Sequence, residues 1–376
     1  MEPSIYSFSL CTALPLMLFF GFYFLFAKTP EKKIFKNYLR SRQIMGIAML
    51  LLSANYSVHF FFGIRFKNAD SAILMNMSTY FLCYSLFSSA LIMLLDRFYI
   101  TKRRVWTHII LWIIFSTLSG VVLFLLPSGI MQKFSLFALA VWLVVFGVVL
   151  ARRVIIAYRR AIRIFNETQA DDIGTYIEWL SIFTYWAVIF GVGCGLLTFL
   201  PDKYVFIWIL SSIPFYSYLF YSYQNYLLFY EQVENAFEQD IQSEEELLTD
   251  TETEPKIVSE KEVPVSYTEI IEKVANWIKT DGYVQQGLTI KELSKILYTN
   301  RTYLSAYIKT TYKMTFREWI TSLRLEYAKN ILKEHPEINI QKLAESSGFL
   351  SRSNFIKLFT EKEGCTPAKW KKANLK

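Results

Sequence analysis

The sequence is short of charge, of cysteine and of histidine, and each shortage argues against a class of protein. Only 19% of the 376 residues are charged and 53% are hydrophobic, whereas ~25% charged is ordinary for a soluble chain. The cysteines predict no disulfide framework, because Cys11, Cys83 and Cys194 lie in apolar runs and Cys365 lies alone in the polar end. The three histidines show no metal-ligand spacing. A secreted disulfide scaffold and a metal enzyme are both unsupported.

Catalytic signatures are also missing. No phosphate-binding loop, nucleophile elbow or pair of intramembrane carboxylates occurs in the chain. We therefore expect a protein that is not an enzyme and that needs no cofactor.

The charged residues divide the chain into three blocks. Residues 1–230 carry 19 Lys and Arg against 9 Asp and Glu, residues 231–264 carry 2 against 12, and residues 265–376 carry 19 against 11. We interpret these blocks as a membrane domain, an acidic flexible linker and a polar C-terminal domain.

The first block contains seven apolar stretches long enough to cross a bilayer. A hydrocarbon core ~30 Å thick needs ~20 apolar residues in a helix, because only a helix satisfies its own backbone there. The expected fold is all-α, with a polytopic seven-helix transmembrane sensor bundle ahead of a cytoplasmic domain. The predicted spans are Ile5–Ala27, Ile44–Ile64, Ala72–Leu95, Trp106–Leu126, Phe134–Ala151, Trp179–Leu200 and Tyr204–Tyr223.

The loops between these spans differ in basic charge. Those after spans 1, 3 and 5 hold fifteen Lys and Arg, and those after spans 2, 4 and 6 hold four. Since basic loops stay on the cytoplasmic side, the N-terminus is expected outside and the C-terminal domain in the cytoplasm. The predicted location is the inner membrane of a bacterium.

Three polar residues lie within the spans. Asn55 and His59 share one face of the second span at a four-residue spacing, and Asn76 lies in the third. Polar groups in a membrane are costly and often functional, so a sensor site for a ligand or a proton is one interpretation. Hydrogen bonding between helices is the alternative, and we favour it.

The last span runs into the acidic block. Tyr223, Tyr230 and Phe237 share one heptad position, and Tyr226 and Val233 share another. We interpret this seam as a short parallel coiled coil joining two copies of the chain, with packing on the chain's own bundle as the alternative. The remainder of residues 231–264 is acidic and contains proline, which is typical of a flexible tether.

Capping residues mark the helices of the third block. Thr289 with Glu292 and Thr315 with Glu318 each match a capping box. The predicted helices are Ile290–Leu297, Arg301 to about Thr311, Phe316–Glu334, a short helix capped by Asn339, and Arg352–Lys362.

This block also repeats itself. Apolar residues at helical spacing in the first half correspond to those in the second, as Leu293 does to Leu343 and Leu304 to Phe355. A paired helix–turn–helix offers the outward residues of its second helix to the DNA major groove. The resulting DNA-binding candidates are Arg301, Thr302, Ser305, Ala306 and Lys309 in the first unit and Arg352, Ser353, Ile356 and Lys357 in the second.

Four motifs extend the pattern: "RLEYAKNIL" (Arg324–Leu332), "LAESSGF" (Leu343–Phe349), "FIKLF" and "GCTPAKW" (Gly364–Trp370). Through them, residues 270–372 resemble the AraC-type transcriptional regulators. The resemblance implies two helix–turn–helix units joined by a central helix that read successive major grooves ~34 Å apart. It also places Thr302, Ser305 and Ala306, and Ser353, Ile356 and Lys357, against the bases.

Two features depart from the family pattern. Lys313 stands where a glycine is common, and a left-handed cap without glycine costs ~1 kcal/mol. The first reading helix offers small side chains at its centre, so we expect base discrimination to depend on the second helix and on contacts with thymine methyl groups. Phosphate contacts are expected from Lys309, Lys313, Lys369, Lys371 and Lys372.

The sequence thus predicts a membrane-embedded transcriptional regulator. Its expected partners are double-stranded DNA, RNA polymerase, membrane lipid, a second copy of the chain and an unidentified hydrophobic or membrane-borne ligand. The competing hypothesis is a membrane receptor or transporter whose tail binds a protein instead of DNA.

Overall fold

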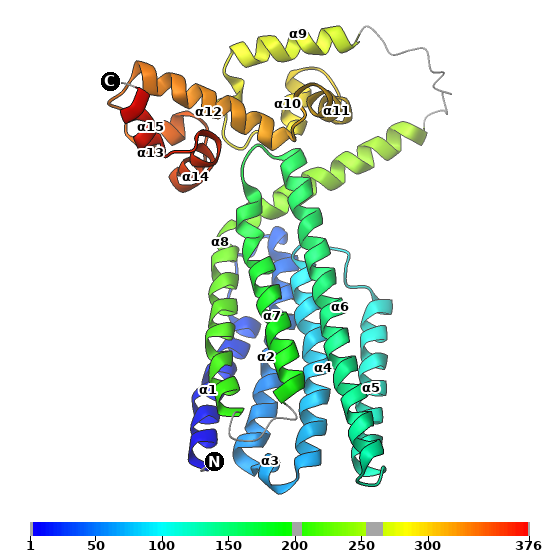
Figure 1. Cartoon of the computed structure of the whole chain (residues 1–376). Coiled ribbons are helices and arrows are strands. Elements are labelled where there is room, and N and C mark those ends of the chain that lie inside the picture. Colours follow the sequence, from blue (N-terminus) through cyan, green and yellow to red (C-terminus); the bar gives the residue numbers. More distant parts are fainter. Residues whose placement is uncertain (1–2, 198–204, 253–265, 375–376) are drawn as a thin grey trace. The chain divides into compact units, whose positions relative to one another are not determined.

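A computed structural model describes residues 3–197, 205–252 and 266–374 (Figure 1). The described residues are helical, apart from turns and one isolated β-bridge between Gln169 and Thr289. The chain divides into two compact units. The first comprises Met1–Arg160 and Tyr176–Glu231, and the second comprises Ala161–Thr175 and Gln232–Lys376.

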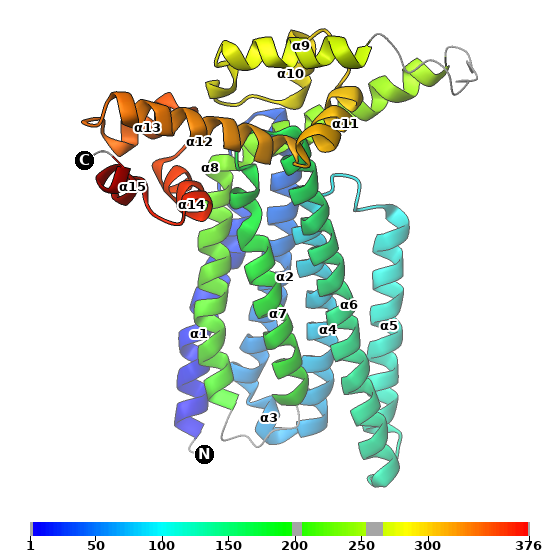
Figure 2. The same cartoon turned by 45° about the horizontal axis from the view of Figure 1, so that its top comes forward.

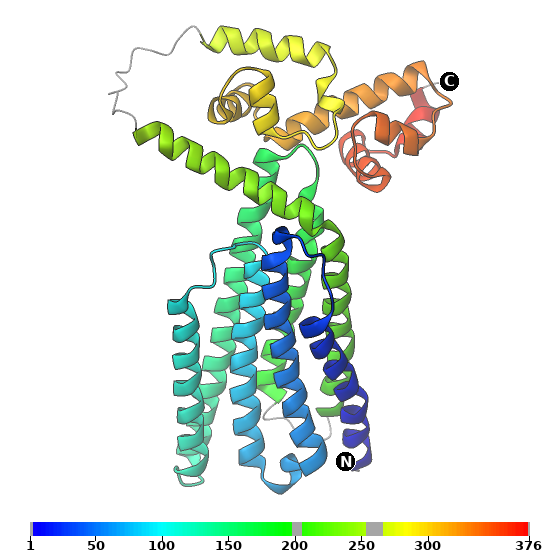
Figure 3. The ribbon, with the colours of Figure 1, turned by 180° about the vertical axis from the view of Figure 1, so that it is seen from behind.

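The first unit is a bundle of long helices that run up and down beside one another (Figures 1 and 3). Successive long helices pack on one another, α1 on α2, α2 on α4 and α4 on α5, and α4 also packs on α7 from later in the chain. The helices that build it are α1 (Pro3–Phe26), α2 (Lys36–Phe62), the short α3 (Ile64–Lys67), α4 (Ala69–Met93), α5 (Lys102–Phe124), α6 (Ile130–Thr168), α7 (Glu178–Leu197) and α8 (Val205–Glu252). The ends of α6 and α8, after Arg160 and Glu231, belong to the second unit.

Each of the seven predicted spans overlaps a long helix, with residues 198–200 of the sixth and Tyr204 of the seventh lying outside the described residues. The helices differ in apolarity. Six stretches in the described residues are long and apolar enough to cross a membrane, and α4 is not among them. It is an inner helix, with eleven buried residues against three in α5. A helix covered by its neighbours needs less apolar surface, and α4 accordingly carries Asn76 and several serines.

The basic loops gather at one end of the bundle. The connections α1–α2 and α4–α5 lie at that end, and the N-terminus, α3 and the α5–α6 connection lie at the other (Figure 3). This alternation is the arrangement that the charge bias of the loops predicts.

Two helices are longer than predicted. The fifth span was expected to end at Ala151, yet α6 continues to Thr168 and, at 39 residues, is about 58 Å long. The predicted flexible linker is helical over its first part, because α8 continues to Glu252. The sequence up to that point contains good helix formers such as Glu, Gln and Leu and no proline after Pro214. The remainder of the linker, residues 253–264, lies outside the described residues.

The heptad seam on α8 is buried within the chain itself. Tyr223, Tyr226, Tyr230 and Val233 are at most 1% exposed. The Tyr230 ring lies 5.4 Å from that of Tyr38, in the first unit. This burial agrees with the alternative interpretation of the seam, in which the end of the helix packs on its own chain. Dimerisation stays a prediction and would need a different surface.

The second unit contains two helix–turn–helix pairs joined by the long helix α12 (Figure 2). Its side-chain caps form as predicted, including complete capping boxes at Thr289 and Thr315. The helices are α9 (Ser266–Lys279), α10 (Ile290–Ile296), α11 (Arg301–Tyr312), α12 (Phe316–Glu334), α13 (Ile340–Ser346), α14 (Arg352–Glu363) and α15 (Pro367–Asn374), with a short 3-10 turn η4 (Gly282–Val284).

Each helix–turn–helix pair has its own core. Leu293, Leu304 and Ile308 are fully buried in the first core, and Leu343, Phe355 and Phe359 take the matching places in the second. The internal repeat predicted from the sequence is therefore a repeat of packing.

One segment of the second unit comes from the range that the sequence analysis assigns to the membrane domain. Residues 161–175 cluster by their contacts with the unit that holds the helix–turn–helix pairs. Ala170 is 2% exposed and is part of the first core, and Phe165 packs 4.8 Å from Phe237. The local sequence says little about this, because the contacts reach 72 residues along the chain from Phe165 to Phe237 and 118 residues from Ala170 to Leu288.

Candidate nucleic-acid interface

The first reading helix is α11, which begins after Asn300. The Asn300 side chain caps it by accepting a hydrogen bond of 2.7 Å from the Tyr303 amide. Leu304, Tyr307 and Ile308 face the core. Of the predicted DNA-binding residues, Thr302, Ala306 and Lys309 are exposed, and Arg301 and Ser305 are half-buried. Thr302, Ser305, Ala306 and Lys309 follow a three- and four-residue spacing, so they lie on one face.

The second reading helix, α14, is arranged in the same way. Ser351 caps it by accepting from the Asn354 amide at 3.2 Å, and Phe355 and Phe359 are buried. Arg352, Ser353 and Lys357 are exposed. Ile356 is half-buried because it also packs against the second core, so only part of this side chain is open to a base.

The predicted phosphate-binding lysines differ in their surroundings. Lys313 is exposed and has a left-handed backbone with φ of 58°, as expected from its position after α11. Lys369 and Lys372 are exposed and Lys371 is half-buried. Lys309 is paired: its Nζ lies 2.9 Å from a carboxylate oxygen of Glu167.

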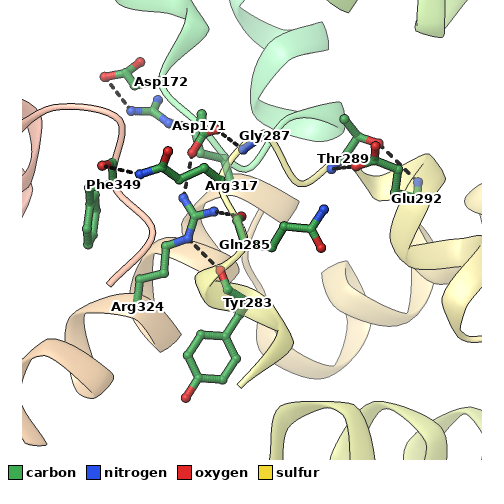
Figure 4. Close-up of polar contacts among 11 residues, drawn as sticks. Asp171, Asp172, Tyr283, Gln285, Gly287, Thr289, Glu292, Arg317, Arg324 and Phe349 are labelled. Carbon is green, nitrogen blue, oxygen red and sulfur yellow. Dashed lines mark hydrogen bonds and ion pairs between the residues drawn. The ribbon is translucent and has the colours of Figure 1, made fainter. Parts of the chain in front are cut away.

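Arg324 lies at the junction of the two helix–turn–helix units (Figure 4). It is 1% exposed and belongs to α12. Its guanidinium donates to the carbonyl oxygens of Tyr283 and Gln285 and to the Asp171 carboxylate, each at 2.7 Å. The other Asp171 oxygen accepts from the Gly287 amide at 2.7 Å. The buried positive charge is thus neutralised by a residue 153 positions away in the chain.

The second helix–turn–helix unit contacts the same junction through the turn between α13 and α14. The Gln286 side chain donates to the Phe349 carbonyl at 3.2 Å. Gly348 has φ of +83°, and a Cβ built there would lie 2.4 Å from the Val284 carbonyl oxygen and 2.9 Å from Arg324 Nε. Glycine is required at this position because both the backbone conformation and the space exclude a side chain.

Residues 166–172, which we call the strap, make further contacts with the first helix–turn–helix unit. Arg317 pairs with Asp172 at 2.7 Å and donates to the Asn166 side chain at 3.0 Å. The Ala170 amide donates to the Leu288 carbonyl at 2.9 Å, next to the bridge between Gln169 and Thr289. The strap therefore adds one short stretch of paired backbone to the domain.

Sequence reasoning missed the strap. Asp171 and Asp172 form an acidic pair that comes after five arginines in the same connection between helices. This change in the sign of the charge is the only local signal that the strap differs from the basic loops. Their partners cannot be identified without the fold.

Two side chains outside the bundle have shifted pKa values. Partial burial lowers the pKa of Lys329, but pairing with Glu326 at 2.6 Å and Glu363 at 3.1 Å outweighs this and raises it overall. Burial raises the pKa of Tyr283, and its hydrogen bond to Asp281 adds to that rise. Both groups therefore keep their neutral-pH protonation, which suits structural roles.

Each of the three polar residues of the bundle makes a hydrogen bond to a neighbouring helix. His59 Nε2 lies 2.9 Å from Asn76 Oδ1, and the other ring nitrogen lies 3.1 Å from the Tyr6 hydroxyl. Asn55 donates to the Thr79 hydroxyl at 3.2 Å. These are the inter-helix hydrogen bonds that we favoured. The sequence did not identify Tyr6 as the partner of His59 or Thr79 as the partner of Asn55.

A separate cavity of about 100 Å³ lies among α2, α4, α6, α7 and α8. Its lining is mostly apolar, with Tyr56, Tyr80, Tyr84 and Tyr216 contributing hydroxyl groups. The Tyr84 hydroxyl donates to the Gly191 carbonyl at 2.8 Å. Asn55, His59 and Asn76 do not line it. Within the described residues, no group of three His, Cys, Asp or Glu is placed to hold a metal ion.

Comparison with known proteins identifies only the C-terminal part. A family described as "Helix-turn-helix domain" matches residues 293–373. The "Uncharacterized HTH-type transcriptional regulator YobQ" of Bacillus subtilis is 33% identical over 86 residues, covering 23% of this chain and 35% of that protein. The corresponding YtdP protein of the same species is 32% identical over 87 residues, covering 23% of this chain and 11% of that protein.

A third relative has a more specific name. The "Msm operon regulatory protein" of Streptococcus mutans is 26% identical over 118 residues, covering 30% of this chain and 42% of that protein. The chain thus spans less than half the length of these relatives, and no solved structure matches it. Residues 293–373 are thus similar to helix-turn-helix domains, and the relatives they match are named as HTH-type transcriptional regulators or as an operon regulatory protein.

Proposed function

We propose that this protein is a membrane-embedded, one-component transcriptional regulator that reads DNA with two helix–turn–helix units. The observation that carries the proposal is the pair of equivalent reading helices, α11 and α14, each presenting an exposed face away from its own core. The helix-turn-helix relatives support the DNA-binding part. The six apolar helices support the membrane part.

Each unit would use its reading helix in the major groove. Polar contacts to phosphates position the domain, and contacts to base edges give sequence preference. Lys357 and Arg352 are long, exposed polar side chains on α14, and we assign the base contact to Lys357. Thr302, Ser305 and Ala306 on α11 suit short or apolar contacts. RNA polymerase is the partner through which such a regulator acts.

The signal would be read inside the bundle. The cavity among α2, α4, α6, α7 and α8 is the best candidate for a hydrophobic or membrane-borne ligand, because its lining is mostly apolar. Engineered apolar cavities of about 150 Å³ take up benzene, so a cavity of about 100 Å³ suits a single small apolar group. With the basic loops inside, the C-terminal domain faces the cytoplasm.

Genome-wide crosslinking of the full-length protein, tagged at Lys376, tests the proposal. A few sharp promoter peaks sharing a motif ~20 base pairs long are expected, since two major-groove contacts lie one helical turn apart. A flat profile in every growth condition would favour the competing hypothesis, a membrane receptor whose tail binds a protein.

A further inference from the structure

We propose that the strap occupies a docking surface on the first helix–turn–helix unit and competes there with DNA. The docking surface consists of Lys309, Arg317 and Arg324 with the backbone of residues 285–289. The proposal rests on the proposed function, because it assumes that α11 approaches DNA.

The strap and the docking surface are complementary in charge. Each acidic residue of the strap meets one cation: Glu167 meets Lys309 at 2.9 Å, Asp171 meets Arg324 at 2.7 Å, and Asp172 meets Arg317 at 2.7 Å. A segment with three carboxylates resembles a stretch of phosphate backbone in its charge. The partner that fits this surface is therefore an acidic chain, and residues 166–172 are already bound to it.

The position of Lys309 makes the strap a competitor. Lys309 shares its face of α11 with Thr302, Ser305 and Ala306, the predicted base-facing residues. Glu167 therefore lies beside the C-terminal end of that reading face. A DNA phosphate that approached Lys309 would have to displace this carboxylate, and the two anions repel each other.

The three pairs differ in how easily they can exchange. Arg324 and Asp171 have side chains 2% and 6% exposed, whereas Lys309 and Glu167 are 49% and 34% exposed. A buried pair is hard to break, because each partner would be left charged and out of water. An exposed pair is weak and readily exchanged. Asp171 thus anchors the strap, while Glu167 can let go of Lys309 without unfolding the domain.

The strap is joined directly to the bundle. Glu167 lies in the last turn of α6, the helix that also lines the cavity with Val144, Gly147 and Val148. A ligand that shifts α6 along its axis would move Glu167 with it. The pair of Glu167 and Lys309 is therefore the point at which such a movement changes the reading face.

The test compares DNA binding by full-length proteins in phosphatidylcholine nanodiscs. The variant E167Q/D172N removes the two carboxylates that pair with Lys309 and Arg317, and it leaves the Asp171 anchor in place. The matched control E334Q/E337Q removes two exposed carboxylates near the C-terminal end of α12. The probe is a labelled random-sequence duplex of ~40 base pairs, titrated at salt concentrations from ~50 to ~300 mM.

We expect E167Q/D172N to bind the duplex roughly ten-fold more tightly at low salt, with the slope of log K against log salt steeper by ~0.9 for each cation that gains a phosphate. The control should keep the wild-type slope. An unchanged or lower affinity in E167Q/D172N, or an equal gain in both double variants, would overturn the strap proposal. If no protein, wild type included, binds the duplex at low salt, the proposed DNA-binding function fails and the strap proposal fails with it.

Discussion

The two helix–turn–helix units are alike in build and unlike in what surrounds them. Both have a first helix of seven residues and a reading helix of twelve, with capping side chains at the same places. The strap packs on the first unit alone, where it pairs with Lys309 at the reading face. In the second unit, Lys357 is exposed at the corresponding face. In the function proposed above, the repeated part would serve recognition, and the part that is not repeated would serve control.

Removing the Asp171 carboxylate, which anchors the strap on the first helix–turn–helix unit, should have the largest effect on stability. In D171A, Arg324 keeps two carbonyl partners but loses its counter-charge, and breaking a buried pair costs ~3–5 kcal/mol. We expect a loss of this order in the unfolding free energy of the second unit, measured by thermal unfolding of the purified protein. The double variant D171A/R324M should recover part of it, because the unpaired charge is gone. Equal losses in both proteins would show that charge is not the cause.

The turn glycines offer a matched pair of changes. Gly348 and Gly364 both have positive φ, 83° and 72°, but a Cβ at Gly348 would meet the Val284 carbonyl while one at Gly364 would meet nothing within 4 Å. G348A should therefore destabilise the domain by ~3 kcal/mol and G364A by only ~1 kcal/mol. Denaturant unfolding distinguishes them. Similar losses would mean that backbone strain alone decides, and that the contact between the units does not matter.

Base reading should be concentrated in the second unit. We expect K357A to change the preferred base at one position of the binding site by ~1–3 kcal/mol, because a lysine can donate to a guanine edge. K371A should weaken binding to all sequences alike, as expected of a phosphate contact. Selection of bound duplexes from a random pool measures both effects. A uniform loss in both variants would remove Lys357 from the base-reading set.

The caps after the reading helices allow a smaller test. Lys313 and Gly364 hold equivalent positions, and both are left-handed. K313G should stabilise the first unit by ~1 kcal/mol, since glycine adopts this conformation without a Cβ penalty. Thermal unfolding measures the gain. No change, or a loss, would mean that the Lys313 side chain makes up for the strain.

The smallest expected effect is a pH dependence at Lys329. Its pKa is raised above 10.5 by Glu326 and Glu363, so the stabilisation is fully present below that pH and is lost as the pH rises past it. Replacing Glu363 by Gln should cost ~0.5–1 kcal/mol at pH ~8. The difference from wild type should shrink above pH ~10.5 in denaturant titrations. A difference that is constant with pH would assign the cost to packing instead.

Local features of the second unit were predictable because their causes are local. The caps Thr289, Asn300, Thr315 and Ser351 act on amides three residues away, so their letters alone place the helix starts. The core positions follow from the apolar spacing in the same way. The long apolar runs likewise predicted each long helix of the bundle, including α4, which its neighbours cover.

Only the tertiary structure decided what those elements touch. The amino-acid sequence determined where the helices begin, which faces are apolar and which loops are basic, because these depend on residues within about two turns. The Arg324–Asp171 pair joins residues 153 positions apart, and the inward-facing tyrosines of α8 meet aromatic side chains from other helices. The residues next to a buried charge or an aromatic ring in the sequence do not identify its partner. The tertiary structure determines the partner, because burying a polar group without one costs free energy.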